Sequence, residues 1–154
     1  MQALQFRTAT KADIPFLVAL RHATMNEHLA RANAARDEAS QLARVLVQFE
    51  HARIVSVNGR DIGLLKAYKE PARWYIRQIQ IAPEFQGQGI GRAIIADILA
   101  QASHDNLPTA LKVLSGNPAR RLYETLGFKE IGREDVDYLM LCPPRPERFS
   151  AQSN

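Results

Sequence analysis

PEFQGQGIGR, residues 83–92, contains three glycines at alternate positions: 87, 89 and 91. An alternating apolar run that ends near Ile81 precedes this stretch, and apolar residues at helical spacing follow from Ile90. Glycine is costly to order, so this density of glycines indicates a backbone that turns sharply or lies close to another group. The sequence therefore predicts a glycine-rich connection between a strand and a helix.

The start of the predicted helix suits an anion. A helix N-terminus exposes backbone N–H groups and carries the positive end of the peptide dipole, and glycines let an anion reach those groups. Phosphate or pyrophosphate is thus the expected ligand of residues 86–92, with Arg92 adding charge. A P-loop is excluded because no Lys-Ser or Lys-Thr follows these glycines. The dinucleotide fingerprint G-x-G-x-x-G is also excluded, because Arg92 and Ile94 occupy the positions where its last glycine would lie. A glycine-rich connection without a ligand remains the alternative.

Length and composition are those of one ordinary globular domain, with 154 residues, 46% apolar and 23% charged. We expect the domain over residues 1–142 and a loose, proline-containing tail over residues 143–154. No secretory signal pattern opens the chain and no apolar run is long enough for a membrane span, so a cytoplasmic location is expected. Cys142 is the only cysteine, which excludes an internal disulfide and a multi-cysteine zinc site. No metal is predicted.

The net charge is +4, but the lysines and arginines are scattered along the chain rather than gathered in one block. Nucleic-acid-binding proteins concentrate them on one face, so a nucleic acid is not expected as partner. A solvated basic surface is the simplest interpretation, and a local field that draws an anionic ligand is the other.

The first half of the chain predicts one strand, two helices and a hairpin. A strand over residues 4–9 precedes a helix that starts after Thr10 and Asp13, which resemble a capping box, and runs to about residue 29. A second helix is predicted by apolar residues on one side: Leu42, Val45, Leu46 and Phe49. Residues 30–40 fit a loop or continued helix. Asn58-Gly59 predicts a tight hairpin turn between two strands.

The second half alternates strands and helices. A long strand over residues 73–82 leads into the glycine-rich stretch and a helix with five apolar positions: Ile94, Ile95, Ile98, Leu99 and Ala102. A strand over residues 109–114 follows, then a short helix with Asn117 as cap, Pro118 at its first position and Gly127 at its end. Two final strands complete the order, which predicts a mixed sheet covered by helices.

On these motifs the sequence resembles the GNAT superfamily of acyl-CoA-dependent N-acyltransferases. The phosphate loop of that family, Arg/Gln-x-x-Gly-x-Gly/Ala, is matched by Gln86, Gly87, Gln88, Gly89, Ile90 and Gly91. IQIAPEFQ precedes the loop and NPARRLYETLGF follows it in the family's order, and the resemblance extends from Leu4 to about Leu141. It implies an α/β (α+β) fold with a mixed, mostly antiparallel central sheet of about seven strands flanked by about four helices.

The resemblance also implies the donor site. The backbone of Ile79 and Ile81 would bond the pantetheine arm of acetyl-CoA like an added strand. The amides of residues 86–92 would hold its pyrophosphate. Asn117 would contact the cofactor from the cap of the later helix, and Tyr123 would lie near the thioester sulfur.

The implied activity is transfer of an acetyl group from acetyl-CoA to a primary amine by direct attack in a ternary complex. Tyr123 suits the leaving group, because a phenol with pKa ~10 stays protonated where a thiol with pKa ~8.5 begins to ionise. A backbone N–H such as that of Ile81 could stabilise the oxyanion. An aromatic residue packed on a helix flank is the alternative for Tyr123.

One departure from the family concerns the base. Many relatives carry a glutamate in the strand before the loop or in the strand before the short helix, and here those strands offer polar or basic residues instead: Arg77, Gln78, Gln80 and Lys112. Amines of low pKa are therefore expected to be the better acceptors. That hypothesis weakens if another acid or base reaches the site: Glu27, His28, Glu50 or His51.

The acceptor site is expected at the first helix, where the family lines its acceptor pocket. Arg21, Met25 and His28 fall along one helix face, and Arg21 could hold a substrate carboxylate. A small-molecule or peptide amine is the expected partner. A non-catalytic acyl-CoA-binding sensor on the same fold is the alternative function, and homodimerisation through the late strands stays open.

Overall fold

A computed structural model describes residues 3–31 and 38–146, with the side chains of residues 25–31 excepted. Its strands are β1 (Leu4–Thr8), β2 (Ala52–Val57), β3 (Arg60–Lys69), β4 (Trp74–Ile81), β5 (Thr109–Leu114), β6 (Lys129–Glu134) and β7 (Asp137–Cys142). Its α-helices are α1 (Ile14–Arg31), α2 (Glu38–Leu46), α3 (Ile90–His104) and α4 (Ala119–Thr125).

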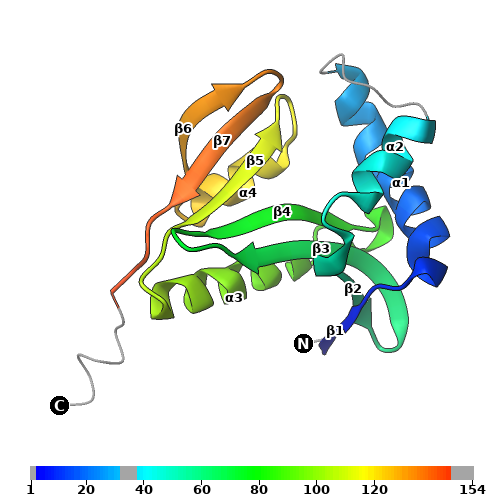
Figure 1. Cartoon of the computed structure of the whole chain (residues 1–154), viewed down its shortest axis with the longest axis horizontal. Helices are drawn as coiled ribbons and strands as arrows, with labels where there is room; N and C mark the ends of the chain where they lie inside the picture. The colour runs from blue at the N-terminus through cyan, green and yellow to red at the C-terminus, as the bar shows by residue number, and fades with distance from the viewer. Residues whose placement is uncertain (1–2, 32–37, 147–154) are drawn as a thin grey trace.

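The strands form one seven-stranded sheet in the order β1-β2-β3-β4-β5-β7-β6. Only β4 and β5 are parallel, and their pairing covers three residue pairs, from Trp74–Thr109 to Ile76–Leu111. Beyond these pairs the two strands diverge, so that β5, β7 and β6 rise away from β1–β4 as the second arm of a V (Figure 1). The predicted fold class, a mixed and mostly antiparallel sheet with helices, is confirmed.

Helices cover both faces of the first arm. The apolar side of α3 packs on one face, where all five positions predicted from its sequence are buried: Ile94, Ile95, Ile98, Leu99 and Ala102. A separate apolar cluster joins α1 and α2 to the other face through Leu17, Leu20, Val45, Ile54 and Leu64. The hairpin is also confirmed, since Asn58 and Gly59 have φ values of 53° and 80°.

The exposed face of α2 differs from the sequence prediction. Leu42 and Leu46 are 40% and 47% exposed, whereas Gln41 and Val45 are buried. Phe49 lies beyond the helix, in a 3-10 turn. The reason is that α1 presents a guanidinium to α2, and Nε of Arg21 donates to Oε1 of Gln41 at 2.6 Å. A polar residue of α2 is therefore turned inward. Residues 32–37 of the undecided segment between the helices lie outside the described residues.

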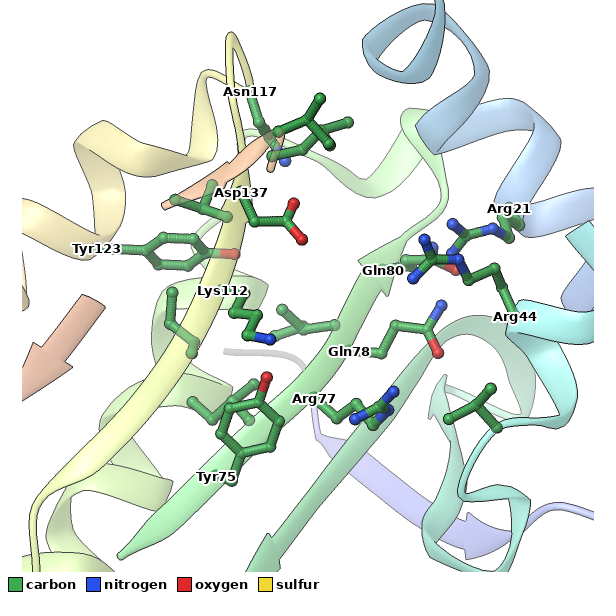
Figure 2. A pocket seen from close by; sticks show the side chains of 17 residues that line it. Arg21, Arg44, Tyr75, Arg77, Gln78, Gln80, Lys112, Asn117, Tyr123 and Asp137 are labelled. Atoms are coloured by element: carbon green, nitrogen blue, oxygen red, sulfur yellow. The ribbon is translucent and has the colours of Figure 1, made fainter. Parts of the chain in front are cut away.

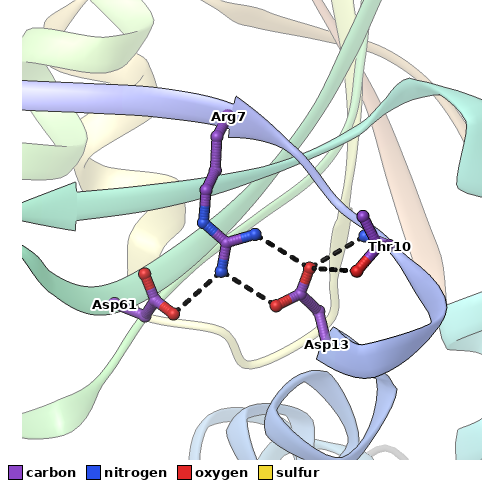
Figure 3. A network of polar contacts seen from close by, with 4 residues as sticks. All are labelled: Arg7, Thr10, Asp13 and Asp61. Carbon is purple, nitrogen blue, oxygen red and sulfur yellow. Dashed lines mark hydrogen bonds and ion pairs between the residues drawn. The ribbon is translucent and has the colours of Figure 1, made fainter.

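An ion-pair network fixes the entry into α1 (Figure 3). Arg7 of β1 donates to both carboxylate oxygens of Asp13, at 3.0 and 2.8 Å, and to Asp61 of β3 at 2.9 Å. The N–H of Thr10 donates to the Asp13 carboxylate at 2.8 Å, as the predicted capping box requires. These bonds lower the pKa of Asp13 to about 2, with the Arg7 hydrogen bond as the main cause.

Two further predictions concern the ends of the chain and membranes. Arg145 donates from its N–H to Ser103 Oγ at 3.0 Å and from its guanidinium to the carbonyl of Leu126, so the start of the predicted tail contacts the domain. Residues 147–154 of that tail lie outside the described part. None of the helices described here combines the length and apolarity that crossing a bilayer requires.

Candidate active site

The glycine-rich loop has an open approach to the start of α3. Gly87 and Gly89 have φ values of +78° and +82°, in the left-handed region that favours glycine, and a Cβ added at either would meet nothing within 4 Å. Ala93 is the first residue of the helix whose N–H finds a backbone acceptor, the carbonyl of Gly89 at 3.0 Å. Among the described residues, the N–H groups of residues 87–92 make no such bond. They can bind an anion.

The polar side chains of this segment shape the loop. Nε2 of Gln86 donates to the carbonyl of Ile81 at 2.9 Å, and Nε2 of Gln88 donates to that of Glu84 at 3.3 Å. Arg92 donates to Oγ1 of Thr125 at 2.8 Å, which ties α3 to α4. The backbone amides are thus the main ligands that the loop offers, and the side chains hold them in place.

Near the glycine loop, one edge of β4 borders the region where β4 and β5 separate. The N–H of Ala82 donates to Ile62 of β3 at 2.8 Å. Because successive backbone groups of a strand alternate in direction, those of Ile81 and Ile79 face the β5 side. Among the described strands, none pairs with that side of β4 beyond Ile76. The Gln86 bond occupies the carbonyl of Ile81 and leaves its N–H and the backbone of Ile79 for a ligand strand.

A pocket of about 220 Å³ lies where β4 and β5 separate. Its walls come from α1, α2, β4, β5, α4 and β7, and Figure 2 shows their side chains. The polar lining residues are Arg21, Arg44, Tyr75, Arg77, Gln78, Gln80, Lys112, Asn117, Tyr123 and Asp137. The strand divergence therefore creates a polar cavity in the middle of the sheet.

Tyr123 of α4 is 7% exposed and its hydroxyl points into this pocket (Figure 2). Its ring packs edge-on against Phe128 with centroids 6.0 Å apart. Burial raises the pKa of Tyr123 to about 12, because the phenolate would lose its hydration. The phenol is therefore fully protonated at neutral pH and can donate a hydrogen bond.

Asn117 has the capping role that the sequence predicts. Its Oδ1 accepts the N–H of Ala119 at 2.9 Å, the first residue of α4 as the structure assigns it. The helix thus begins one residue later than predicted, after Pro118. Asn117 also lines the pocket, next to the end of β5 (Figure 2).

Sequence reasoning missed Asp137, the single carboxylate among the described residues that line the pocket. It lies at the start of β7, opposite Leu114 of β5, and its carboxylate points into the pocket. Burial raises its pKa, an effect that the nearby Arg44 and Lys112 oppose. The pairing of the last strand with β5 could have identified it, because that pairing places EDVDY, residues 134–138, beside the end of β5.

The other proposed acids and bases do not meet at this pocket. Glu50 is exposed, and the ring of His51 stacks on Tyr68 with centroids 4.4 Å apart; neither lines the pocket. The side chains of Met25, Glu27 and His28 lie outside the described residues. Arg21 does line the pocket, as expected for the acceptor side.

Comparison with known proteins agrees with this geometry. Residues 8–138 match the acetyltransferase (GNAT) domain family. No curated protein matches the sequence.

Solved structures share the fold at low identity. The PaiA N-acetyltransferase of Thermoplasma acidophilum, in complex with coenzyme A, is 12% identical with a TM-score of 0.71, over 92% of this chain and 99% of that one. An acetyltransferase of Thermus thermophilus is 20% identical with a TM-score of 0.72, over 93% and 99%. The ribosomal-protein-S18-alanine N-acetyltransferase of Escherichia coli is 18% identical with a TM-score of 0.66, over 94% and 96%.

The family match covers most of the chain, and the divergent strands, the glycine loop and the central pocket lie within it. The chain belongs to the GNAT acetyltransferase family.

Proposed function

We propose that the protein is an N-acetyltransferase that moves an acetyl group from acetyl-CoA to a primary amine in a ternary complex. The observation that carries the proposal is the pocket between β4 and β5, which receives the Tyr123 hydroxyl and the Asp137 carboxylate. The glycine loop, which connects β4 to α3, gives the donor a place next to this pocket. A coenzyme A complex of the same fold supports this arrangement.

The residues present fit coenzyme A. The N–H groups of residues 87–92 are available to the pyrophosphate, and the absence of a Cβ at Gly87 and Gly89 lets it approach. Arg92, exposed at the first turn of α3, adds positive charge. The unpaired edge of β4 at Ile79 and Ile81 suits the amide groups of the pantetheine arm.

The proposed reaction converts an ammonium and the thioester into an amide, a free thiol and one proton released to solvent. The amine must first lose a proton, so that its lone pair can form the C–N bond as the C–S bond breaks. Holding the two reactants together supplies much of the rate.

Asp137 and Tyr123 carry out different proton transfers in the proposed reaction. The carboxylate of Asp137 accepts the proton of the acceptor ammonium, directly or through water. The phenol of Tyr123 donates a proton to the sulfur as it leaves, and the second proton lost by the attacking nitrogen restores the phenol. The high pKa of this phenol keeps the donor proton in place until the sulfur leaves. Asn117 caps α4 and so holds the helix that carries Tyr123. Asp137 replaces the strand glutamate that many relatives use.

The acceptor is proposed to be a small-molecule or peptide amine. A neighbour of the same fold is named for acetylating an alanine of a ribosomal protein, which supports an amino group as acceptor. The lone cysteine is in keeping with the cytoplasm as the proposed location.

A panel of amines, amino acids and short peptides with acetyl-CoA tests the proposal, with release of free thiol and acetylated product as readouts. Thiol release that depends on the amine supports acetyl transfer. Tight binding of coenzyme A without turnover on any acceptor would favour the acyl-CoA-binding sensor instead.

A further inference from the structure

Arg21 is a buried cation that pairs with no carboxylate of the described residues. Its side chain lines the pocket although the residue is only 5% exposed. Its one hydrogen bond to described residues runs from Nε to the neutral amide of Gln41 at 2.6 Å, which leaves both terminal nitrogens of the guanidinium for another partner. Burial lowers the pKa of Arg21 to about 10, and the charge of Arg44 adds to that effect. A buried charge is costly unless it is paired.

Arg44 and Arg77 line the same side of the pocket as Arg21, and we call the three residues the arginine wall (Figure 2). Within the described residues no Asp or Glu forms an ion pair with any of them. Arg7 shows the contrast, because its guanidinium bonds two carboxylates. Three like charges gathered without an ion-pair partner repel one another, and an anion between them would lower that cost.

Gln80 gives a second, independent sign of a polar ligand. It lies on β4 beside the arginine wall, is 4% exposed, and lines the pocket. Neither its Nε2 nor its Oε1 has a hydrogen-bond partner among the described residues. Buried polar atoms of native proteins are nearly always bonded, so this amide points to a polar group that the chain itself does not supply.

The opposite side of the pocket has the reverse character. Asp137 and the Tyr123 hydroxyl lie there, on the side of β7 and α4, together with Lys112 of β5, whose ammonium is paired with Glu134 (Figure 2). The pocket thus offers a carboxylate for an ammonium at one end and guanidinium groups for an anion at the other. Its volume of about 220 Å³ is small for a ligand site, which favours a compact molecule.

We propose that the acceptor is a small amine that also carries an anionic oxygen group, a carboxylate or a phosphate, bound by the arginine wall. The inference rests on the proposed acetyltransferase function and names its substrate class. Guanidinium groups bind both kinds of oxyanion through paired hydrogen bonds, so the experiment must separate them.

Matched acceptors that differ only in the anionic group provide the test. Each ω-amino acid from glycine to 6-aminohexanoate is compared with the alkylamine of the same length, and O-phosphoethanolamine is compared with ethanolamine. Values of kcat/KM are expressed per neutral amine, so that differences in amine pKa do not enter. We expect the wild-type protein to prefer the anionic member of at least one pair about 100-fold, and the preferred pair identifies carboxylate or phosphate.

Variants then locate the anion. Arg77→Gln, at an exposed position, is expected to reduce this preference about tenfold, and Arg21→Gln, at a buried position, about 100-fold. Thermal unfolding checks that each variant is folded. If Arg21→Gln does not fold, the test is made with Arg77→Gln alone. Arg53→Gln is the matched control, because Arg53 is exposed on β2 and does not line this pocket. It should keep the wild-type preference.

Calorimetric titration of the same pairs, in the presence of coenzyme A, makes the test independent of turnover. The inference is supported if the anionic member binds more tightly and if this advantage is weakened in Arg77→Gln but not in Arg53→Gln. The same binding result without any acetylation would support the inference and contradict the proposed function. Turnover or binding that is equal within each pair overturns the inference and leaves the acetyltransferase function standing.

Discussion

The Tyr123 hydroxyl and the Asp137 carboxylate point into one pocket from α4 and β7, although neither residue lies on the two strands whose divergence forms it. Burial raises the pKa of both groups. For Tyr123 this secures a protonated donor at neutral pH. For Asp137 it yields a carboxylate that is a stronger base than an exposed aspartate.

Replacing Tyr123 by Phe removes the proposed donor to the leaving sulfur and keeps the ring packing against Phe128. We expect kcat to fall roughly 100- to 1000-fold, the range for loss of a positioned acid. The dissociation constant of coenzyme A, measured by calorimetry, should stay within about twofold of wild type. Unchanged kcat would show that Tyr123 is only a packing residue.

Replacing Asp137 by Asn tests the proposed base through pH. At neutral pH the wild-type carboxylate is ionised, and the variant should be slower by about 100-fold in kcat/KM. As pH falls through the raised pKa of Asp137, the wild-type group becomes protonated and loses its function as base. The ratio of wild-type to variant kcat/KM should therefore shrink towards one as the pH is lowered from 8 into the acid range. A ratio that stays constant over this range would mean a structural role.

Gly89→Ala tests whether the glycine loop binds the pyrophosphate of coenzyme A. Gly89 has φ +82°, and an added Cβ would meet none of the described residues within 4 Å. The methyl group would therefore extend into the space that we propose for the pyrophosphate. We expect coenzyme A to bind at least about tenfold more weakly. Gly59→Ala is the control, because Gly59 has φ +80° and equal space around its Cβ but lies in the β2–β3 hairpin. Both variants should lose about 1 kcal/mol of stability from the left-handed backbone, and only Gly89→Ala should lose affinity.

The Arg7–Asp13 pair should make the stability of the domain depend on acid. The pKa of Asp13 is lowered from 3.8 to about 2 in the folded state, so its contribution is full above about pH 4 and is lost as pH falls through about 2. Asp13→Asn lacks this contribution at every pH. The difference in free energy of unfolding between wild type and variant, from urea titrations, should shrink by about 1 to 2 kcal/mol between pH 5 and pH 2. A difference independent of pH would count against the ion pair.

Local patterns predicted the scaffold and the glycine loop, which we propose as part of the donor site. Glycine at positions 87 and 89 is needed for positive φ angles beside a helix start, and Asn58-Gly59 is needed for a tight hairpin; both requirements act within a few residues. The helical spacing of apolar residues in α3 likewise predicted its buried face. On α2 the same rule failed, because a neighbouring helix places Arg21 against Gln41 and turns a polar residue inward.

The sequence by itself determined the strand–loop–helix unit, the order of elements and the helix that carries Tyr123, since each depends on backbone preferences and on spacing within a short segment. Only the tertiary structure decided that Asp137 belongs to the pocket, and that Arg21, which the family resemblance placed on the acceptor side, lines it as a buried residue. Their positions follow from the pairing of β7 with β5 and the packing of α1 and α2 on the sheet, contacts between segments distant in the chain that no local pattern encodes. The chemistry proposed for the acceptor depends on those two contacts.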